Sequence, residues 1–302
     1  MGAMPDEVDQ LCAKLKNVTV EPYGGVEYHK GTLAGKQVVV CCAGMGKANA
    51  AATTQVLITK FGAEKIIFSG IAGNMTSKIG IGDVVIGKTV LYHDAQLDMI
   101  CQNPPFLKEY TGDPELIAAA EAACAEAGVK ALVGKIATGD LFVGDSETKA
   151  AIEAKCAPDC VEMEGAAVSQ IAAKNGVPCV ILRAMSDNAD EDGHEVLVVK
   201  KFSIAEYVTT ATAIVARMLE SLYPHTESSY CFAMPSAQRE CRRRGHCCVL
   251  GGDTAQSKPS PGGGRRPEGP DEAASHGCSR KWWPNCFVLF ALSRAIFSIY
   301  NV

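Results

Sequence analysis

The stretch "PDCVEMEGAAVSQIAAKNGVPCVILRAMSD", residues 158–187, contains two apolar runs separated by a helical pattern. The runs at 160–165 and 177–187 are continuously apolar rather than alternating, which predicts strands buried on both faces. The segment between them, 164–176, follows the first run at once and ends in glycine, as a helix does. A strand, a helix and a strand in direct succession are typical of an α/β domain.

The same alternation continues over residues 1–222. Segment 113–128 begins with Asp113, a good N-cap, followed by Pro114 at the first helical position, and it stops at Gly128. We therefore predict a single α/β/α domain of three layers, with helices on both faces of a central mixed sheet. The other expected strands are 36–44, 64–73 and 82–92, and the other expected helices are 49–62 and 203–222.

Residues 223–302 have a different composition. They are rich in Gly, Pro, Ser and Arg without periodicity, which predicts a disordered tail that buries no core. Their apolar end, 282–302, is interrupted by a proline, an asparagine and an arginine, so a membrane anchor is not favoured. A zinc site is not favoured either, because the spacing in "CRRRGHCC" (241–248) matches no zinc pattern.

Charge and cysteine content restrict the function classes. The net charge is −5, and residues 223–302 carry ten Lys/Arg and six Asp/Glu, so the body carries −9. An acidic body argues against nucleic-acid binding. Eight of the 14 cysteines lie before residue 223, several of them in apolar runs. With no secretory signal at the start, this predicts reduced, buried thiols and a cytoplasmic protein.

The stretch "GMGKANAA" (44–51) joins an expected strand to an expected helix. Its glycine spacing is not that of a dinucleotide-binding fingerprint, and its lysine lacks the upstream glycine of a P-loop. It predicts a tight turn at the carboxyl edge of the sheet. Ligand crevices form at such edges, so the turn indicates where a site should lie.

Glu162 and Glu164 lie two residues apart in an otherwise apolar segment. If 160–164 is extended, both side chains project from one face, because strand residues i and i+2 share a face. Two semi-buried carboxylates need partners, and the paired hydroxyls of a ribose are one possibility. The alternative is that one glutamate is exposed and the other caps the following helix. Spacing alone does not decide between these interpretations.

A second polar cluster ends the strand at 177–187. Arg183, Ser186 and Asp187 lie there, at a position where sites form in such sheets, so the cluster favours a site. Asp187 is a candidate general acid or base, although aspartate also serves as a turn residue. Glu7, in "GAMPDEV", would by itself be interpreted only as a favourable acid in the first turn of a helix.

Together these segments resemble the 5′-methylthioadenosine/S-adenosylhomocysteine nucleosidases of the purine-nucleoside phosphorylase-like superfamily. The resemblance runs from residue 2 to about residue 222 and keeps its order. "VEMEGAA" with "SDNAD" downstream is specific to the superfamily, and the "GAM" start with its glutamate narrows it to the nucleosidases. The matching pieces are "GAMPDEV", "AGMGKANAAATTQVLI", "FSGIAGN", "IGDVVI", "YHDAQLD", "ATGDLFV", "VEMEGAAV" and "LRAMSDNAD".

The resemblance implies roles for the polar residues. Asp187 looks like the general acid that protonates N7 of adenine, and Glu7 looks like the residue that holds and activates the attacking water. Glu164 looks like the ligand of the ribose hydroxyls, with Met163 against the sugar. Arg183 and Glu162 resemble supporting residues of the pocket, with Ser186 beside the general acid.

The resemblance also implies a base site and an oligomeric state. Adenine would stack on Phe142, the backbone of Val143 would read the base edge, and the backbone of Ala72 and Gly73 would lie behind the base. The family completes its pocket across two subunits, which implies a homodimer whose partner supplies Leu97 and Ile100 to the 5′-thioalkyl pocket. A small-molecule nucleoside is the implied substrate, and the family implies no metal and no organic cofactor.

The implied reaction is hydrolysis of the N-glycosidic bond of methylthioadenosine and adenosylhomocysteine, a step of methionine salvage. Cleavage passes through a cationic sugar, which an anionic Glu164 stabilises, and adenine leaves well only when protonated. Phosphorylases of the superfamily hold phosphate with arginines from early loops, whereas the first arginine of this chain is Arg183. Water is therefore the expected nucleophile, with Lys47 the remaining candidate for a phosphate site.

Three departures from the family keep alternatives open. Ile71 stands where many members have a serine or threonine that supports the general acid. An apolar residue at this position also occurs in relatives that act on aminodeoxyfutalosine. The 190–208 loop is longer than usual. Members also place a short apolar strand before "GAM", so the sheet is expected to lack a strand and Glu7 to lie near a loose end. A non-catalytic nucleoside-binding protein, an aminodeoxyfutalosine nucleosidase and a purine nucleoside phosphorylase are the alternative functions.

Overall fold

A computed structural model describes residues 1–190 and 205–222. The predictions for the 223–302 tail, including the membrane and zinc alternatives, lie outside these residues, and so does most of the 190–208 loop. Within the described ranges, no helix combines the length and the apolar character that a membrane crossing needs. No group of three or more potential metal ligands gathers there either.

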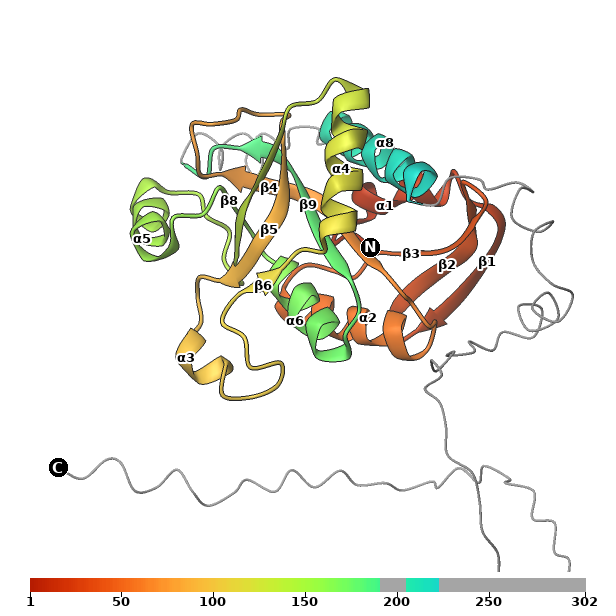
Figure 1. Cartoon of the computed structure of the whole chain (residues 1–302), viewed down its shortest axis with the longest axis horizontal. Coiled ribbons are helices and arrows are strands. Elements are labelled where there is room, and N and C mark those ends of the chain that lie inside the picture. The colour runs from red at the N-terminus through yellow and green to blue at the C-terminus, as the bar shows by residue number, and fades with distance from the viewer. Residues whose placement is uncertain (191–204, 223–302) are drawn as a thin grey trace, which may run out of the picture. The chain divides into compact units, whose positions relative to one another are not determined.

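The central sheet is mixed, as predicted, and it curls back on itself. Its strand order is β6-β5-β7-β8-β4-β9, and an antiparallel pairing between β5 and β9 closes the ring (Figure 1). The β4–β9, β5–β7 and β7–β8 pairs are parallel, while β4–β8 and β5–β6 are antiparallel. The strands are β4 (Ile66–Asn74), β5 (Val84–Tyr92), β6 (Tyr110–Thr111), β7 (Ala131–Thr138), β8 (Cys160–Glu162) and β9 (Cys179–Asp187).

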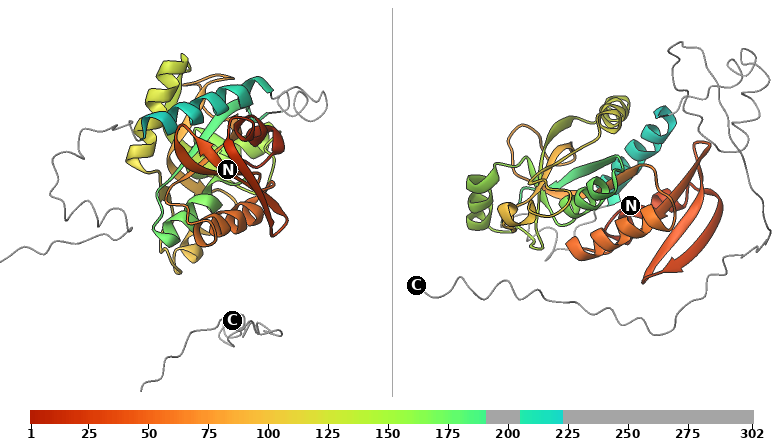
Figure 2. Two further views of the ribbon diagram at one scale, coloured as in Figure 1. Left: turned by 90° about the vertical axis from the view of Figure 1, so that its right-hand side faces the viewer. Right: turned by 60° about the horizontal axis from the view of Figure 1, so that its bottom comes forward.

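Helices cover both faces of this sheet, which confirms the three-layer α/β/α class (Figures 1 and 2). One layer holds α2 (Lys47–Thr59) and α6 (Gly165–Asn175), which pack on one hydrophobic cluster. The other holds α1 (Pro5–Cys12), α4 (Pro114–Ala127) and α8 (Ala205–Ser221), which pack on a second cluster. The short helix α3 (Leu97–Ile100) and helix α5 (Ser146–Cys156) follow β5 and β7 in the chain.

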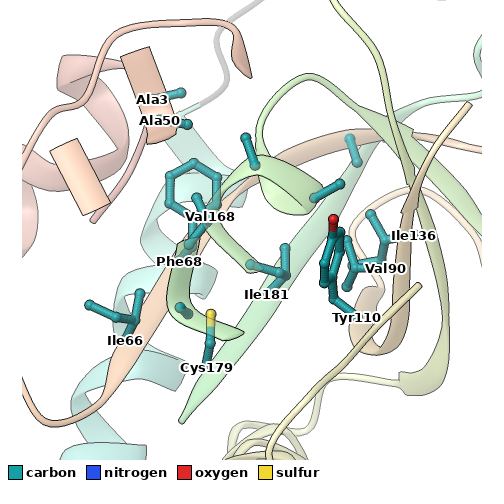
Figure 3. Close-up of a cluster of buried hydrophobic side chains, with 14 of the residues drawn as sticks. Ala3, Ala50, Ile66, Phe68, Val90, Tyr110, Ile136, Val168, Cys179 and Ile181 are labelled. Atoms are coloured by element: carbon teal, nitrogen blue, oxygen red, sulfur yellow. The ribbon is translucent and has the colours of Figure 1, made fainter. Parts of the chain in front are cut away.

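The apolar runs found in the sequence form the core. All nine residues of β9 are buried, as predicted for a strand covered on both faces. Phe68 of β4 and Ile181 of β9 lie in the first hydrophobic cluster with Val168 of α6 (Figure 3). Burying each such side chain stabilises the fold by roughly 1.5–3 kcal/mol. Asp113 caps α4 as expected, since its carboxylate accepts a hydrogen bond from Leu116 N at 3.0 Å.

A separate three-stranded antiparallel sheet was not recognised in the sequence. It contains β1 (Lys16–Tyr23), β2 (Val26–Leu33) and β3 (Lys36–Cys41), of which only β3 was predicted. Most of β1 is exposed on both faces, so it shows no apolar pattern that marks a strand. β7 and α5 were also not recognised: a lysine and a glycine interrupt β7, and α5 buries only Ile152.

Residues 1–3 link the two sheets, and they are firmly held. Gly2 pairs with Cys42 in parallel, Met1 donates from its ammonium group to Ile67 O at 3.0 Å, and Ser69 N donates to Met1 O at 3.1 Å. The expectation that Glu7 lies near a loose end is therefore wrong. In the described chain, the rest of β3 and β4 is not joined by backbone pairing, and a cavity of about 840 Å³ lies between these two strands.

Candidate active site

A second cavity, of about 420 Å³, lies where the carboxyl ends of β4, β8 and β9 meet the start of α1 and the loop after β7. All eleven residues predicted for the site line this cavity. They come from segments far apart in the sequence, and the fold brings them together: Glu7, Ala72, Gly73, Phe142, Val143, Glu162, Met163, Glu164, Arg183, Ser186 and Asp187.

Arg183 lies at the inner wall of the cavity and is only 1% exposed. Its Nη2 donates to a carboxylate oxygen of Glu162 and, at 3.1 Å, to Oε2 of Glu164. The guanidinium group also lies over the ring of Phe68, 4.5 Å from its centroid. One buried cation thus balances two buried carboxylates, and Arg183 is occupied within the protein rather than offered to a ligand.

Glu162 lines the cavity, but its carboxylate is bonded to groups of the protein itself. The strand β8 ends at Glu162, so the 160–164 segment is not fully extended as the first interpretation assumed. The Glu162 carboxylate accepts hydrogen bonds from the backbone N–H groups of Glu164 at 3.0 Å and Gly165 at 2.7 Å, and from the hydroxyl of Thr138. It therefore caps α6, as the alternative proposed, but neither glutamate is exposed.

Glu164 presents its carboxylate to the cavity. Its Oε1 accepts a hydrogen bond from Gly46 N at 2.8 Å, in the turn that the glycine pattern placed at the crevice. Burial raises the pKa of Glu164 to about 7, against the opposing effect of Arg183. A carboxylate with this pKa becomes anionic near neutral pH, where it can accept hydrogen bonds from hydroxyl groups and stabilise a positive charge.

Glu7 is held by three backbone amides. Ala3 N and Met4 N donate to Oε2 at 2.6 and 3.0 Å, and Ile71 N donates to Oε1 at 3.2 Å. The position follows from local structure, because Glu7 is the third residue of α1 and reaches back to the helix start. Its carboxylate lines the cavity in a fixed orientation, as a group that positions a water molecule requires.

Asp187, at the end of β9, is held by Ser186 and by the following turn. Ser186 Oγ donates to Oδ2 at 2.8 Å, and Ala189 N donates to Oδ1 at 2.8 Å. Ile71 itself offers no hydroxyl, so the serine beside Asp187 supplies the hydroxyl that bonds to this carboxyl group. Asp187 is buried on the cavity wall. It is far from Gly73 in the sequence but pairs with it in the sheet, where β9 lies beside β4.

Apart from Asp6, the remaining side chains of the wall are apolar. Phe142 is 42% exposed beside Val143, and Met163 lies next to the two glutamates. Sequence reasoning missed Met45 and Leu141, which also line the cavity and carry no chemical signature that could have identified them. Leu97 and Ile100 of α3 do not line it within the described chain.

Lys47 is not presented to the cavity as a phosphate ligand. Its Nζ donates to Asp94 Oδ2 at 2.6 Å and lies 3.6 Å from Asp140 Oδ2. Two carboxylates already compensate this cation, and it is not among the residues that line the cavity. With Arg183 paired to two glutamates and Glu7 at the cavity wall, the site offers an anion where a phosphorylase needs cations.

Comparisons with known proteins identify the family. A sequence profile described as "Phosphorylase superfamily" matches residues 1–220. The 5′-methylthioadenosine/S-adenosylhomocysteine nucleosidase of Shewanella halifaxensis is 38% identical over 201 residues, which cover 64% of this chain and 86% of the relative. The chain belongs to this nucleosidase family.

Solved structures agree with the family. The nucleosidase of Neisseria meningitidis, in complex with methylthio-immucillin-A, has a TM-score of 0.68 and 34% identity, and the match covers 73% of this chain and 96% of that one. Futalosine hydrolase of Helicobacter pylori, another structural relative, has a TM-score of 0.66 and 30% identity, with 72% and 95% covered. The nucleosidase fold therefore includes relatives named for two related substrates.

Proposed function

We propose that this protein hydrolyses the N-glycosidic bond of 5′-methylthioadenosine and S-adenosylhomocysteine, releasing adenine and the 5′-thio-ribose. The observation that carries the proposal is the placement of Glu7, Glu164 and Asp187 around one cavity. Each of the three carboxyl groups is fixed by its own hydrogen-bond donors and lies on a different part of the wall. These three of the carboxyl groups that line the cavity match the three demands of the reaction: a leaving-group acid, a cation stabiliser and a holder of water.

The reaction begins at the base. Asp187 transfers its proton to N7 of adenine, the bond between the sugar C1′ and the base nitrogen breaks, and its electron pair leaves with adenine. Positive charge then develops on the sugar, where the Glu164 carboxylate stabilises it. A water held by Glu7 adds its oxygen to C1′ and gives up a proton to that carboxylate. Phe142 stacks on the base, while Met163 contacts the sugar.

Support for water as the nucleophile comes from the charges. Phosphate would have to approach Glu7, whose two oxygens are fixed on the cavity wall by three backbone amides. The described cations near the site, Lys47 and Arg183, are each paired with two carboxylates. A bound phosphate would be repelled by the Glu7 carboxylate, and neither of these cations is free to offset that repulsion. This disfavours a phosphorylase.

The deciding experiment measures adenine release from methylthioadenosine with and without phosphate. We expect free thio-ribose as product at an unchanged rate in both buffers. Asp187→Asn keeps the size of the side chain but removes the proton, and we expect a loss of about 10²–10⁴-fold or more in kcat. Release only with phosphate would establish a phosphorylase, and tight binding without release would establish a nucleoside-binding protein.

Aminodeoxyfutalosine is the second candidate substrate. Ile71 favours it, because this apolar residue replaces the hydroxyl found in many nucleosidases, and a futalosine hydrolase is among the structural relatives. Both substrates release adenine from a ribose, so the catalytic carboxyl groups serve either reaction. A ratio of kcat/KM values for the two substrates decides between them, and we expect methylthioadenosine to be preferred.

A homodimer and a cytoplasmic location belong to the same proposal. Met99, Phe106 and Leu107 expose large apolar side chains in and after α3, as a subunit interface would provide. The eight cysteines of the described ranges form no disulfide with one another, and four of them are buried, which supports a reducing compartment. Sedimentation equilibrium of the intact chain tests the dimer.

A further inference from the structure

Three charged residues outside the cavity connect two of its loops. Asp94 follows β5 and Asp140 follows β7, the neighbouring parallel strand, while Lys47 begins α2. Asp94 Oδ2 accepts hydrogen bonds from Lys47 Nζ at 2.6 Å and from Asp140 N at 2.9 Å. Asp140 Oδ1 in turn accepts one from Lys47 N at 2.8 Å. We call Lys47, Asp94 and Asp140 the loop clamp.

The two connected loops contribute to different parts of the cavity. The turn before Lys47 carries Gly46, whose N–H donates to the cavity carboxylate of Glu164, on the ribose side. The loop after Asp140 carries Leu141, Phe142 and Val143, on the base side. The clamp therefore joins two backbone segments by direct hydrogen bonds. One segment holds Glu164, the proposed ligand of the ribose, and the other carries the proposed base site.

Burial and charge make the clamp more than an incidental surface pair. The side chains of Lys47 and Asp94 are only 25% and 26% exposed, and Lys47 Nζ also lies 5.6 Å from the ring centroid of Tyr92. Burial raises the pKa of Asp94, but the hydrogen bonds from Lys47 and Asp140 N outweigh it and lower the pKa overall. Asp94 is thus an anion that binds both a side chain and a backbone group, which restricts its geometry.

We propose that Asp94 is a positioning residue that sets the distance between the base and ribose halves of the site. It acts through Lys47 and Asp140, and it touches no substrate. A nucleoside must engage both halves at once, so a variable distance between them weakens nucleoside binding. Adenine alone engages only the base half and is affected less. This inference rests on the proposed function for its choice of ligands.

The test compares graded variants of the intact chain. Asp94→Ala removes both hydrogen bonds, whereas Asp94→Asn keeps an acceptor for Asp140 N and loses only the ion pair. Glu115→Ala is the matched control, because the Lys65–Glu115 pair has the same 2.6 Å distance and lies away from the cavity. For Asp94→Ala we expect KM for methylthioadenosine to rise about tenfold, with a smaller rise for Asp94→Asn and none for Glu115→Ala.

The ratio of two affinities separates positioning from general destabilisation. In Asp94→Ala we expect the Kd of adenine to change by less than about threefold, so that nucleoside binding is lost selectively. The pH dependence of kcat should stay that of the wild type, because the clamp touches neither Glu7 nor Asp187. Equal losses for adenine and nucleoside, or an unchanged KM, would overturn the proposal.

One readout needs no ligand and no turnover. Gly46 N makes no contact with Asp94, yet the clamp holds its turn, so its amide hydrogen should exchange about tenfold faster in Asp94→Ala. Exchange in β9 should be unchanged. If the wild type releases no adenine, the proposed function fails while this exchange measurement still decides on the clamp. Unchanged exchange at Gly46 would refute the clamp, whatever the activity.

Discussion

Glu164 is the residue whose ionisation should be visible in both stability and activity. It is 4% exposed, and burial raises its pKa from the ordinary 4.5 to about 7. The folded protein therefore keeps a proton that the unfolded chain releases. A raised pKa contributes stability below pH 4.5, and this contribution is lost as the pH rises through about 7.

Glu164→Gln removes this titration. Between pH 4.5 and about 7, the wild type should lose up to about 3 kcal/mol of unfolding free energy relative to the variant. Urea unfolding of both proteins at several pH values measures the difference. The kcat/KM of the wild type should also rise as the pH passes 7, because the anion stabilises the sugar cation. Parallel stability curves for the two proteins would contradict the assignment.

We expect Ser186 to compensate for the absence of a hydroxyl at Ile71. Its Oγ is 2.8 Å from Asp187 Oδ2, so Ser186→Ala should leave the general acid less well oriented and lower kcat about tenfold. KM should change little. The control is Ser69→Ala, which removes a buried serine hydroxyl from β4, outside the cavity lining. Steady-state kinetics of the two variants decide, and an equal effect from both would count against the role of Ser186.

At the scale of elements, the turn between β3 and α2 depends on glycine. Gly46 has a φ of 93°, and a Cβ there would lie 3.1 Å from Asp140 Oδ1. Gly46→Ala therefore strains the backbone and pushes on the loop clamp, whereas Gly62, with a φ of 68°, has open space around it.

The two glycines allow a matched comparison. Gly62→Ala should lower the unfolding free energy by about 1–2 kcal/mol because of its positive φ. Gly46→Ala should cost about 1–3 kcal/mol, because a φ of 93° with a ψ of 160° is a conformation that essentially only glycine adopts. Only Gly46→Ala should also lower kcat/KM, about tenfold or more, because its N–H orients Glu164. Thermal unfolding and kinetics measure both effects. A loss of activity in Gly62→Ala would show that strain alone disturbs the site.

The elements differ in how well they could be predicted. β9 and α4 were recognised because a continuous apolar run and a capped, glycine-stopped helix leave signals within their own sequences. β1 was missed because it is exposed and so needs no apolar alternation, and β2 because only Tyr28 and Gly31 are buried in it. β8 was predicted too long, because the chain leaves the strand after Glu162, whose carboxylate reaches forward to the backbone N–H groups at the start of α6.

For the whole molecule, the cavity of about 840 Å³ between β3 and β4 separates the two sheets of the described fold. Val38, Val39 and Ile67 line it, and Met1 lies at one end, in parallel register with β3. The facing edges of β3 and β4 are joined there only by residues 1–3 within the described chain. A strand that continues Met1 backwards would bond to both edges.

An extension of about five β-branched residues before Met1 should therefore join the two sheets, at about 3.3 Å per residue. We expect the Tm to rise by about 5 °C or more, because apolar surface is buried and strand edges are paired. A glycine–serine extension of equal length is the control. Calorimetry measures both proteins. If the two extensions gave the same Tm, the cavity would not accept a strand.

The sequence by itself determined the α/β class, the order of the main strands and helices of the central sheet, the family and eleven of the residues that line the cavity. These properties depend on local patterns and on motifs that stay together along the chain. Only the tertiary structure decided that Glu162 caps a helix while Glu164 faces the cavity, that Lys47 is bound by Asp94 and Asp140, and that Ser186 holds Asp187. The Lys47 contacts join residues far apart in the sequence, whose distance is set by the packing of the sheet and helices. The Glu162 and Ser186 contacts are local, but their side-chain orientations depend on where β8 and β9 end at the cavity.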